Sequence, residues 1–391
     1  MIYDLVIIGA GIQGAGVAQA AAAAGYSTLV LEQSAIAAGT SRSSSKLIHG
    51  GLRYLESGQI SLVRESLRER ALLLKLAPEL VQLQPLHIPI YRHSSRSPLT
   101  IYSGLWLYKF LAGVTSAGSQ FSRLPREAWS NLDGLDTDGL RQVFRYWEAQ
   151  TNDEQLTAAV LASAQSLGAE VRIPAEFTAA QLHSEGCEIE FTQQGQTHTV
   201  RSQALVNCAG PWAPQVLARI TPTPPSPTVE LVQGSHLLLP PLLEHRYYLE
   251  APQDRRAVFA LPWEGKLLLG TTETPYAGAP EAAHCLDTER DYLLETLQHY
   301  FPRLAIPPLA DITSFAGLRV LPQSSQSAFG RSREVLLQMD DVKRPRLLSL
   351  MGGKLTTYRA TAEQAIARLA PTLPKRQTVA RTSELALHPP R

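Results

Sequence analysis

The sequence predicts an α/β fold with a second part of α+β type, and three observations carry this prediction. An apolar run at residues 4–8 precedes a glycine-rich turn and an alanine-rich stretch, which is typical of a strand, a turn and a helix beginning a parallel sheet. Similar apolar runs return at residues 204–207 and 347–350. Between these two runs, short apolar stretches separated by proline-rich turns favour an antiparallel sheet.

Size and composition indicate a compact protein of more than one domain. The chain has 391 residues, and at about 150 residues per domain this suggests two or three units. Apolar residues make up 44% and charged residues 18% of the chain, a composition that excludes a disordered protein.

Charge and cysteine content exclude several classes of function. The 36 basic and 35 acidic side chains leave a formal charge of +1, so no overall field attracts nucleic acid. Three widely spaced cysteines, at positions 187, 208 and 285, suit a reducing compartment and predict neither a metal site nor a disulfide framework.

The first residues carry no signal-peptide pattern, so we expect a cytoplasmic protein. No apolar run reaches the roughly 18–20 residues that a membrane span requires. The nearest candidate, residues 99–114, is interrupted by tyrosines, a lysine and glycines. Peripheral contact with a membrane stays open, and nothing in the sequence predicts the oligomeric state.

The glycine-rich turn has the spacing of a dinucleotide-binding motif. Gly9, Gly11 and Gly14 form GxGxxG, in which they allow a tight turn, close approach of a diphosphate, and close packing of helix on strand. Ile12 and Gln13 open the helix, whose free N–H groups would face the diphosphate. A second strand is predicted over residues 27–31. It ends at Glu32, an acid suited to bind an adenosine ribose. The motif predicts a Rossmann-like unit but leaves NAD and FAD open.

Three further polar or glycine-rich segments are candidates for the rest of the cofactor site. The first, TSRSSSKLIHGGLRYLE at residues 40–56, offers hydroxyl groups and backbone to a phosphate or a ribityl chain. The second, ALVNCAGPW at residues 204–212, returns a strand to the same sheet. The third, MGGKLTTY at residues 351–358, precedes a helix predicted to extend to about Leu369, and a helix start could stabilise an anionic ring.

Taken together, these segments resemble the FAD-dependent glycerol-3-phosphate dehydrogenases, in the D-amino-acid-oxidase-like group of flavoenzymes. The resemblance runs from about residue 2 to residue 370. It rests on GAGIQGAG, SSSKLIHGGLRYLE, GSHLLL, GTTETPY, FAGLRVLP and GGKLTTYR.

The resemblance implies FAD, bound non-covalently by a domain assembled from separated stretches. Besides the glycine motif and Glu32, the implied cofactor-binding residues are Thr40, Ser41, Ser45, Lys46, Leu47, His49, Gly50, Gly51, Ala209, Gly210, Trp212, Gly317, Gly353, Lys354, Leu355 and Thr356. The expected FAD-binding domain comprises residues 1–85, 145–215 and 330–391. The expected substrate domain comprises residues 86–144 and 216–329.

The substrate half is expected to be an antiparallel sheet covered by one helix. Strands are predicted at residues 236–239, 246–249, 257–263 and 266–269, and an amphipathic helix at residues 288–300. The resemblance implies oxidation of the secondary alcohol of glycerol 3-phosphate, or of a similar small hydroxy compound, to the ketone. Dihydroxyacetone phosphate would be the product, and a quinone or another carrier would reoxidise the flavin.

Such a reaction needs a proton acceptor and positive charge near the developing alkoxide. His236 is the preferred acceptor, since histidine titrates near neutral pH. Arg319 and Lys354 are the other expected catalytic residues, and Arg319 is implied to hold the substrate over the flavin. The expected substrate-binding residues are Arg53, Tyr54 and Arg331, although Arg333 could replace the last.

The sequence also departs from the family pattern. About twenty residues follow the last predicted helix, where the family usually continues into a helical domain, so we expect that domain to be absent. The basic, proline-containing tail is expected to be disordered. Two alternatives stay open: an oxidase or dehydrogenase of an amino or hydroxy acid, and a flavin-binding assembly subunit without catalytic activity.

Overall fold

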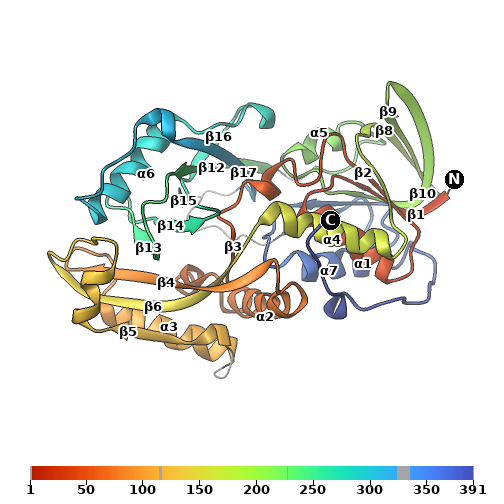
Figure 1. The fold of residues 1–391 in the computed structure, drawn as a ribbon. Helices are drawn as coiled ribbons and strands as arrows, with labels where there is room; N and C mark the ends of the chain where they lie inside the picture. Colours follow the sequence, from red (N-terminus) through yellow and green to blue (C-terminus); the bar gives the residue numbers. More distant parts are fainter. Residues whose placement is uncertain (1, 114–116, 227, 324–334, 391) are drawn as a thin grey trace.

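In the computed structural model, which describes residues 2–113, 117–226, 228–323 and 335–390, two large sheets lie side by side (Figure 1). The first sheet has nine strands in the described part of the chain. They are β1 (Ile2–Ile8), β2 (Thr28–Leu31), β7 (Glu170–Arg172), β8 (Glu176–His183), β9 (Gly186–Gln193), β10 (Gln196–Asn207), β11 (Ile220–Thr221), β18 (Leu336–Met339) and β19 (Leu347–Met351). The α/β expectation is confirmed.

The centre of the first sheet is parallel, as the three returning apolar runs predict. Strand β10 pairs in parallel with both β1 and β19, so Asn207 lies opposite Ile8 on one side and Ser349 on the other. Strand β2 pairs in parallel with the opposite edge of β1. The carboxyl ends of these strands therefore meet at one edge, where doubly wound sheets bind their ligands.

The second sheet has ten strands in the described residues and is mainly antiparallel. They are β3 (Leu47–Ile48), β4 (Val81–Tyr91), β5 (Phe121–Leu124), β6 (Leu140–Thr151), β12 (Val229–Leu239), β13 (Arg246–Glu250), β14 (Ala257–Trp263), β15 (Lys266–Gly270), β16 (Thr274–Tyr276) and β17 (Thr313–Pro322). The four strands predicted in the substrate half are confirmed. One pairing, between β13 and β4, is parallel, which local periodicity alone does not specify.

Seven α-helices are present in the described residues. They are α1 (Ile12–Ala23), α2 (Ile60–Leu76), α3 (Pro98–Ala112), α4 (Asp153–Ser166), α5 (Ala213–Leu217), α6 (Asp287–Tyr300) and α7 (Tyr358–Leu369). Helix α1 packs against α4 and α7 on one side of the first sheet, and its alanines let the three helices approach closely (Figure 1). Helix α6 covers the second sheet through Leu293, Leu297 and the following Phe301. None of these helices combines the length and the apolar character needed to cross a bilayer.

The expectation of a disordered tail is wrong for residues 370–390. The backbone N–H groups of Val379 and Ala380 both donate to the carbonyl oxygen of Ala23 at the end of α1. Arg376 pairs with Asp4 at 2.9 Å, and Leu387 is buried among core residues. Apolar burial and backbone pairing thus outweigh the effect of the prolines on this segment.

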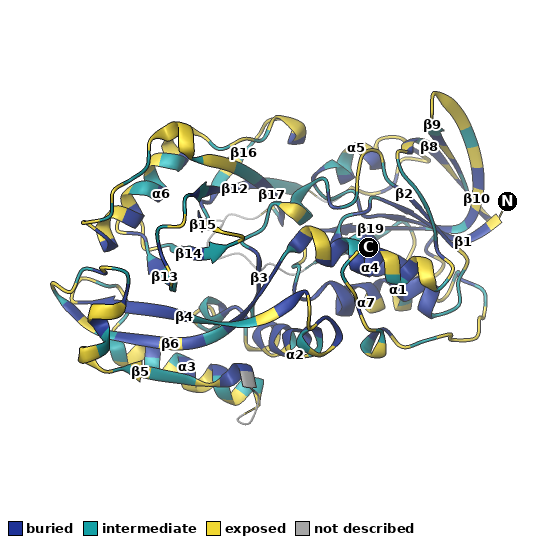
Figure 2. Cartoon of the chain, viewed as in Figure 1, coloured by how far each residue is buried: buried dark blue, intermediate teal, exposed yellow. Residues whose placement is uncertain are grey.

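Both sheets are buried over most of their length (Figure 2), and one carboxylate holds several strands of the second sheet in place. Glu289 of α6 accepts hydrogen bonds from Gln233 and Ser235 of β12 at 2.7 Å each. Thr272 and Thr274 also donate to it, each at 2.8 Å. Burial raises the pKa of Glu289, but these hydrogen bonds outweigh it and hold the pKa below the ordinary 4.5.

Replacing Glu289 by alanine should destabilise the protein by about 3 kcal/mol, because several buried donors lose their acceptor. Since the folded-state pKa is lowered, the carboxylate stabilises the fold above pH 4.5, and the difference between variant and wild type should shrink as the pH falls below that value. Urea unfolding at several pH values measures both effects. Glu295→Ala, on the exposed side of the same helix, is the control, and an equal loss in both variants would contradict the role.

Candidate active site

The glycine turn after β1 is so tight that two of its glycines admit no side chain. A Cβ on Gly9, where φ is +100°, would lie 2.7 Å from the carbonyl oxygen of Cys208. A Cβ on Gly14 would lie 1.9 Å from the carbonyl oxygen of Gly9. The turn therefore brings the start of α1 against the ends of β1 and β10, with its free N–H groups at the sheet edge.

Glu32 lies just beyond the end of β2, next to this turn. Its Oε2 accepts a hydrogen bond from the backbone N–H of Ala10 at 2.8 Å, and its Oε1 accepts one from Ser34 at 2.9 Å. These bonds fix the carboxylate beside the glycines, in the position from which such an acid binds a ribose.

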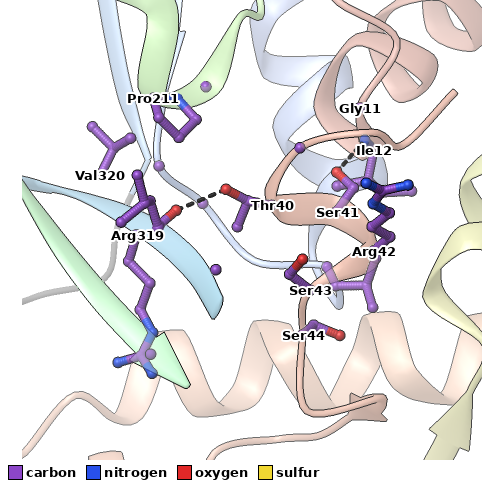
Figure 3. A pocket seen from close by; sticks show the side chains of 18 of the residues that line it. Gly11, Ile12, Thr40, Ser41, Arg42, Ser43, Ser44, Pro211, Arg319 and Val320 are labelled. Carbon is purple, nitrogen blue, oxygen red and sulfur yellow. Dashed lines mark hydrogen bonds between the residues drawn. The ribbon is translucent and has the colours of Figure 1, made fainter. Parts of the chain in front are cut away.

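The hydroxyl-rich segment follows β2 of the first sheet and leads into β3 of the second sheet. Figure 3 shows Thr40, Ser41, Ser43 and Ser44 of this segment at the cavity. Ser41 Oγ accepts a hydrogen bond from the N–H of Ile12 at 2.9 Å, so it caps the start of α1. Thr40 donates to the carbonyl oxygen of Leu318 in β17 at 2.8 Å. The loop is therefore held from both sides, with Arg319 of β17 across from it (Figure 3).

Two residues that were expected to bind the cofactor instead stabilise this segment on the side away from the cavity. Lys46 Nζ lies 2.6 Å from Asp153 Oδ1 and 2.6 Å from the carbonyl oxygen of Arg42, and its side chain is buried. The N–H of Gly50 donates to the Tyr108 hydroxyl at 2.9 Å. Neither Lys46 nor Gly50 lines the cavity described below. Their positions therefore favour support of the loop over direct contact with a cofactor.

A cavity of about 1280 Å³ opens at the edge where these segments meet. Ordinary small-molecule sites occupy roughly 300–1,000 Å³, so this one has room for a dinucleotide and a small substrate. The predicted residues that line it are Gly9, Gly11, Ile12, Gln13, Glu32, Thr40, Ser41, Ser45, Leu47, His49, Gly51, Arg53, Tyr54, Ala209, Gly210, Trp212, His236, Gly317, Arg319, Gly353, Lys354, Leu355 and Thr356. Gly14 lies behind the turn, and Arg331 falls outside the described residues.

Two more glycines shape the cavity far from the first turn. A Cβ on Gly317 would lie 2.6 Å from the carbonyl oxygen of Ser43, and a Cβ on Gly353 would lie 2.6 Å from Gln13 Nε2. The buried Oε1 of Gln13 has no hydrogen-bond partner among the described residues. Such an acceptor in a glycine-lined recess fits a ligand that carries N–H groups, as a flavin ring does.

His236 lies in the second sheet, with its imidazole buried against Phe315. The two rings stack with centroids 5.0 Å apart, and Nε2 lies 2.9 Å from Ser45 Oγ. Burial, together with the positive charges of Arg319 and Lys46, lowers the pKa of His236 to about 3. The expectation that this residue titrates near neutral pH is therefore wrong. Its Nδ1 has no partner in the described part of the chain.

Positive side chains from three distant segments reach the same cavity. Arg319 Nη1 lies 2.8 Å from Glu273 Oε1. Lys354 Nζ lies 4.0 Å from the centre of the Tyr54 ring, and the guanidinium carbon of Arg53 lies 5.9 Å from the same centre. Two cations therefore lie close to the Tyr54 ring, in a constellation suited to an anionic substrate.

Sequence reasoning did not identify several polar cavity residues, among them Ser43, Ser44, Arg256, Glu273 and Glu148. Arg256 donates to the backbone carbonyl of Glu273 at 2.6 Å. Burial raises the pKa of Glu148, although Arg70 and Tyr108 both donate hydrogen bonds to it. Ser43 and Ser44 belong to the hydroxyl-rich segment at residues 40–56, and Glu273 belongs to GTTETPY, in which the alternation of side chains could indicate one functional side of a strand.

The residues present fit FAD. The glycine turn and helix start suit a diphosphate, Glu32 a ribose, and the recess between Gly317 and Gly353 a flavin ring. Bound there, a flavin would lie between the first sheet and the cationic side chains of the second. This arrangement can position a small anion against a redox ring and shield both from water.

Comparison with known proteins agrees with this geometry. Residues 4–359 match the family model described as FAD dependent oxidoreductase. The chain is 36% identical to glycerol-3-phosphate dehydrogenase of Pseudomonas aeruginosa over 95% of its own length and 72% of that protein. It is 34% identical to D-erythritol 1-phosphate dehydrogenase of Brucella abortus, over 95% of this chain and 74% of that one.

Among solved structures, glycerol-3-phosphate dehydrogenase of Bacillus halodurans in complex with FAD superposes with a TM-score of 0.74 and 25% identity. The match covers 99% of this chain and 68% of that one. Glycine oxidase of Geobacillus kaustophilus shares the fold, with a TM-score of 0.71, 19% identity and coverage of 99% and 98%. With the family model matched over most of its length, the chain belongs to the FAD-dependent oxidoreductases and uses FAD as its cofactor.

Proposed function

We propose that the protein oxidises the secondary alcohol of glycerol 3-phosphate to the ketone of dihydroxyacetone phosphate. The observation that carries this proposal is the gathering of Arg53, Lys354 and Arg319 at one cavity beside the flavin recess. An overall charge of +1 attracts no anion, so these side chains must supply the attraction for a phosphate. Relatives at 34–36% identity named for glycerol 3-phosphate and D-erythritol 1-phosphate support the same substrate class.

In this proposal the two sheets divide the work. The glycine turn and strand ends of the first sheet, with the loop that follows β2, hold the cofactor, and His236 and Arg319 of the second sheet hold the reacting end of the substrate. FAD, when bound, supplies the chemistry by accepting the hydride of the alcohol carbon at N5. Arg53, Tyr54 and Arg331 bind the phosphate, the last on the strength of the family resemblance alone. Lys354 lies at the glycine segment that would border the flavin ring and adds positive charge there.

The remaining roles concern the hydroxyl that loses its proton. Arg319 holds this oxygen through its guanidinium and stabilises the developing alkoxide. His236, neutral over the physiological range, offers an uncharged ring nitrogen as the acceptor for the hydroxyl proton. The Ser45 hydroxyl at Nε2 fixes the orientation of the ring.

The first prediction of this function is that glycerol 3-phosphate, added anaerobically to the purified yellow protein, bleaches the flavin band. Arg319→Ala should keep FAD but lower the rate of bleaching by about a hundredfold or more, because the substrate loses its charged anchor at the reacting oxygen. Stopped-flow absorbance measures the rate. Bleaching only by amino acids, with release of ammonia, would favour the oxidase alternative. A flavin that no alcohol or amine reduces would favour the assembly subunit.

The second prediction concerns pH. Because the pKa of His236 is lowered to about 3, its acceptor form persists at every pH above that value, and no loss of activity from its protonation should appear between about pH 5 and 7. His236→Ala should lower kcat/KM by about a hundredfold while leaving the shape of the pH profile unchanged. A wild-type profile that falls below pH 6.5, and a variant in which this fall disappears, would contradict the assignment.

We further propose that the electron acceptor is a quinone, reached by peripheral contact with the cytoplasmic face of a membrane. The supporting observation is the outer face of α3, much of which is exposed (Figure 2). On this face Leu99 and Phe110 are 73% and 72% exposed, and Trp106 and Leu107 are also exposed. Helix α3 contains no acidic residue, and the Lys109 ammonium lies 5.2 Å from the Trp106 ring. An apolar face with an aromatic residue and a cation suits the headgroup region of an anionic bilayer.

The third prediction is that the protein sediments with vesicles containing anionic phospholipid. Trp106→Ser with Phe110→Ser should lower the fraction bound by about tenfold, because the apolar contact with the bilayer is lost. Leu309→Ser with Val342→Ser, at exposed apolar positions elsewhere, is the matched control and should bind as wild type does. Equal binding by all three proteins would contradict a docking role for α3.

A further inference from the structure

The segment Gly270–Tyr276, which reads GTTETPY, turns alternate side chains to opposite sides. Thr272 and Thr274 point toward α6, and both donate to Glu289 Oε1 at 2.8 Å. Thr271 and Glu273 point the other way, toward Arg319. One side of the segment therefore anchors it to the fold, and the other side meets a cavity residue.

Three acceptors from this one segment surround the Arg319 guanidinium. Glu273 Oε1 accepts from Nη1 at 2.8 Å, and Thr271 Oγ1 and the carbonyl oxygen of Thr272 both lie 3.3 Å from Nη2. Gly234 lies directly against the group, since a Cβ there would be 2.6 Å from Nη2. Because the donors of a guanidinium lie in one plane, these contacts restrict the direction of the whole group.

Glu273 contributes the only charge among these acceptors, and its side chain is 4% exposed. Its backbone carbonyl also accepts from Arg256 Nη1 at 2.6 Å, so it stands between two arginines that line the cavity. Arg319 keeps 22% of its side chain exposed and can still meet a ligand. Burying a carboxylate costs desolvation free energy, and folding alone does not require this cost here. The buried carboxylate does, however, fix the direction of a cation that faces the cavity.

We propose that Glu273 is a positioning residue, which orients the Arg319 guanidinium toward the substrate hydroxyl and keeps it from turning toward the phosphate end. This inference rests on the proposed function, because the oxygen that Arg319 meets is taken to be the reacting one. It adds to that function a residue that acts through another side chain, the Arg319 guanidinium.

Glu273→Gln tests the inference, since it removes the charge and keeps the shape. We expect kcat/KM for glycerol 3-phosphate to fall by about ten- to hundredfold, mostly through kcat, because a small displacement of the anchor misaligns the alcohol carbon. Glu273→Asp should recover part of the loss. In an Arg319→Ala background the same Glu273→Gln change should alter kcat/KM by less than about twofold, since its effect acts through Arg319.

Two measurements keep a folding defect apart from a positioning defect. Binding of dihydroxyacetone phosphate, followed by calorimetry, should change by less than about threefold in Glu273→Gln, because the phosphate contacts remain, and the FAD content should stay at the wild-type level. Gly234→Ala, whose methyl group meets the same guanidinium, should lower kcat in the same direction. Glu250→Gln is the matched control, because Glu250 forms a comparable ion pair with Arg96 on the same sheet, away from the cavity.

The outcomes are distinct. If the wild-type protein is neither reduced by glycerol 3-phosphate nor binds dihydroxyacetone phosphate, the proposed function fails. If the wild type does both and Glu273→Gln matches it, or if the losses from Glu273→Gln and Arg319→Ala simply add, only the positioning role fails. A loss of FAD from Glu273→Gln would equally overturn that role, because the residue would then support the fold or the cofactor.

Discussion

The buried ion pair between Lys46 and Asp153 is the interaction on which the rest of the site depends. Asp153 is the first residue of α4, so its carboxylate also meets the positive end of the helix dipole. The same carboxylate accepts from the N–H and the hydroxyl of Ser44. Since an unpaired buried charge is strongly destabilising, the hydroxyl-rich loop cannot leave α4 without a large cost in free energy. The loop is thereby held where Ser41 can cap α1 and Ser45 can reach His236.

This anchored loop explains how a cofactor site forms between two sheets. It crosses from the glycine turn of the first sheet to β3, which joins the edge of the second sheet through β6. Thr40 binds β17 on the way, and Gly317 of β17 approaches the backbone of Ser43 so closely that it can bear no side chain. The long antiparallel pairing of β12 with β17 then sets His236 opposite Phe315 and Val232 opposite Arg319. His236 and Arg319 are thus held by backbone hydrogen bonds of a sheet rather than by a flexible loop.

The charge states of the cavity residues differ from those that each residue type would have by itself in water. Arg319 and Lys46 near His236 favour its neutral form, so positive charge for an alkoxide and an uncharged acceptor for a proton coexist. The negative charge of Glu273 offsets the positive charge of Arg319, so the net charge at this point of the cavity stays low. A phosphate entering this site would meet Arg53 and Lys354, which both lie near the Tyr54 ring. The site therefore combines attraction for an anion with a dry position for proton and hydride transfer.

The sequence by itself determined the elements whose causes are local. Glycine spacing, apolar runs and an acid at a strand end predicted β1, α1, β2 and the return of β10 and β19, because hydrophobic period and backbone freedom are properties of a few consecutive residues. Only the tertiary structure decided which polar side chains face the cavity. Lys46 turned inward to Asp153, Gly50 turned to Tyr108, Glu273 joined Arg319 from a segment 46 residues away, and burial lowered the pKa of His236. These outcomes depend on partners that are distant in sequence and on the exclusion of water. A short stretch of the chain specifies neither the partners nor the burial.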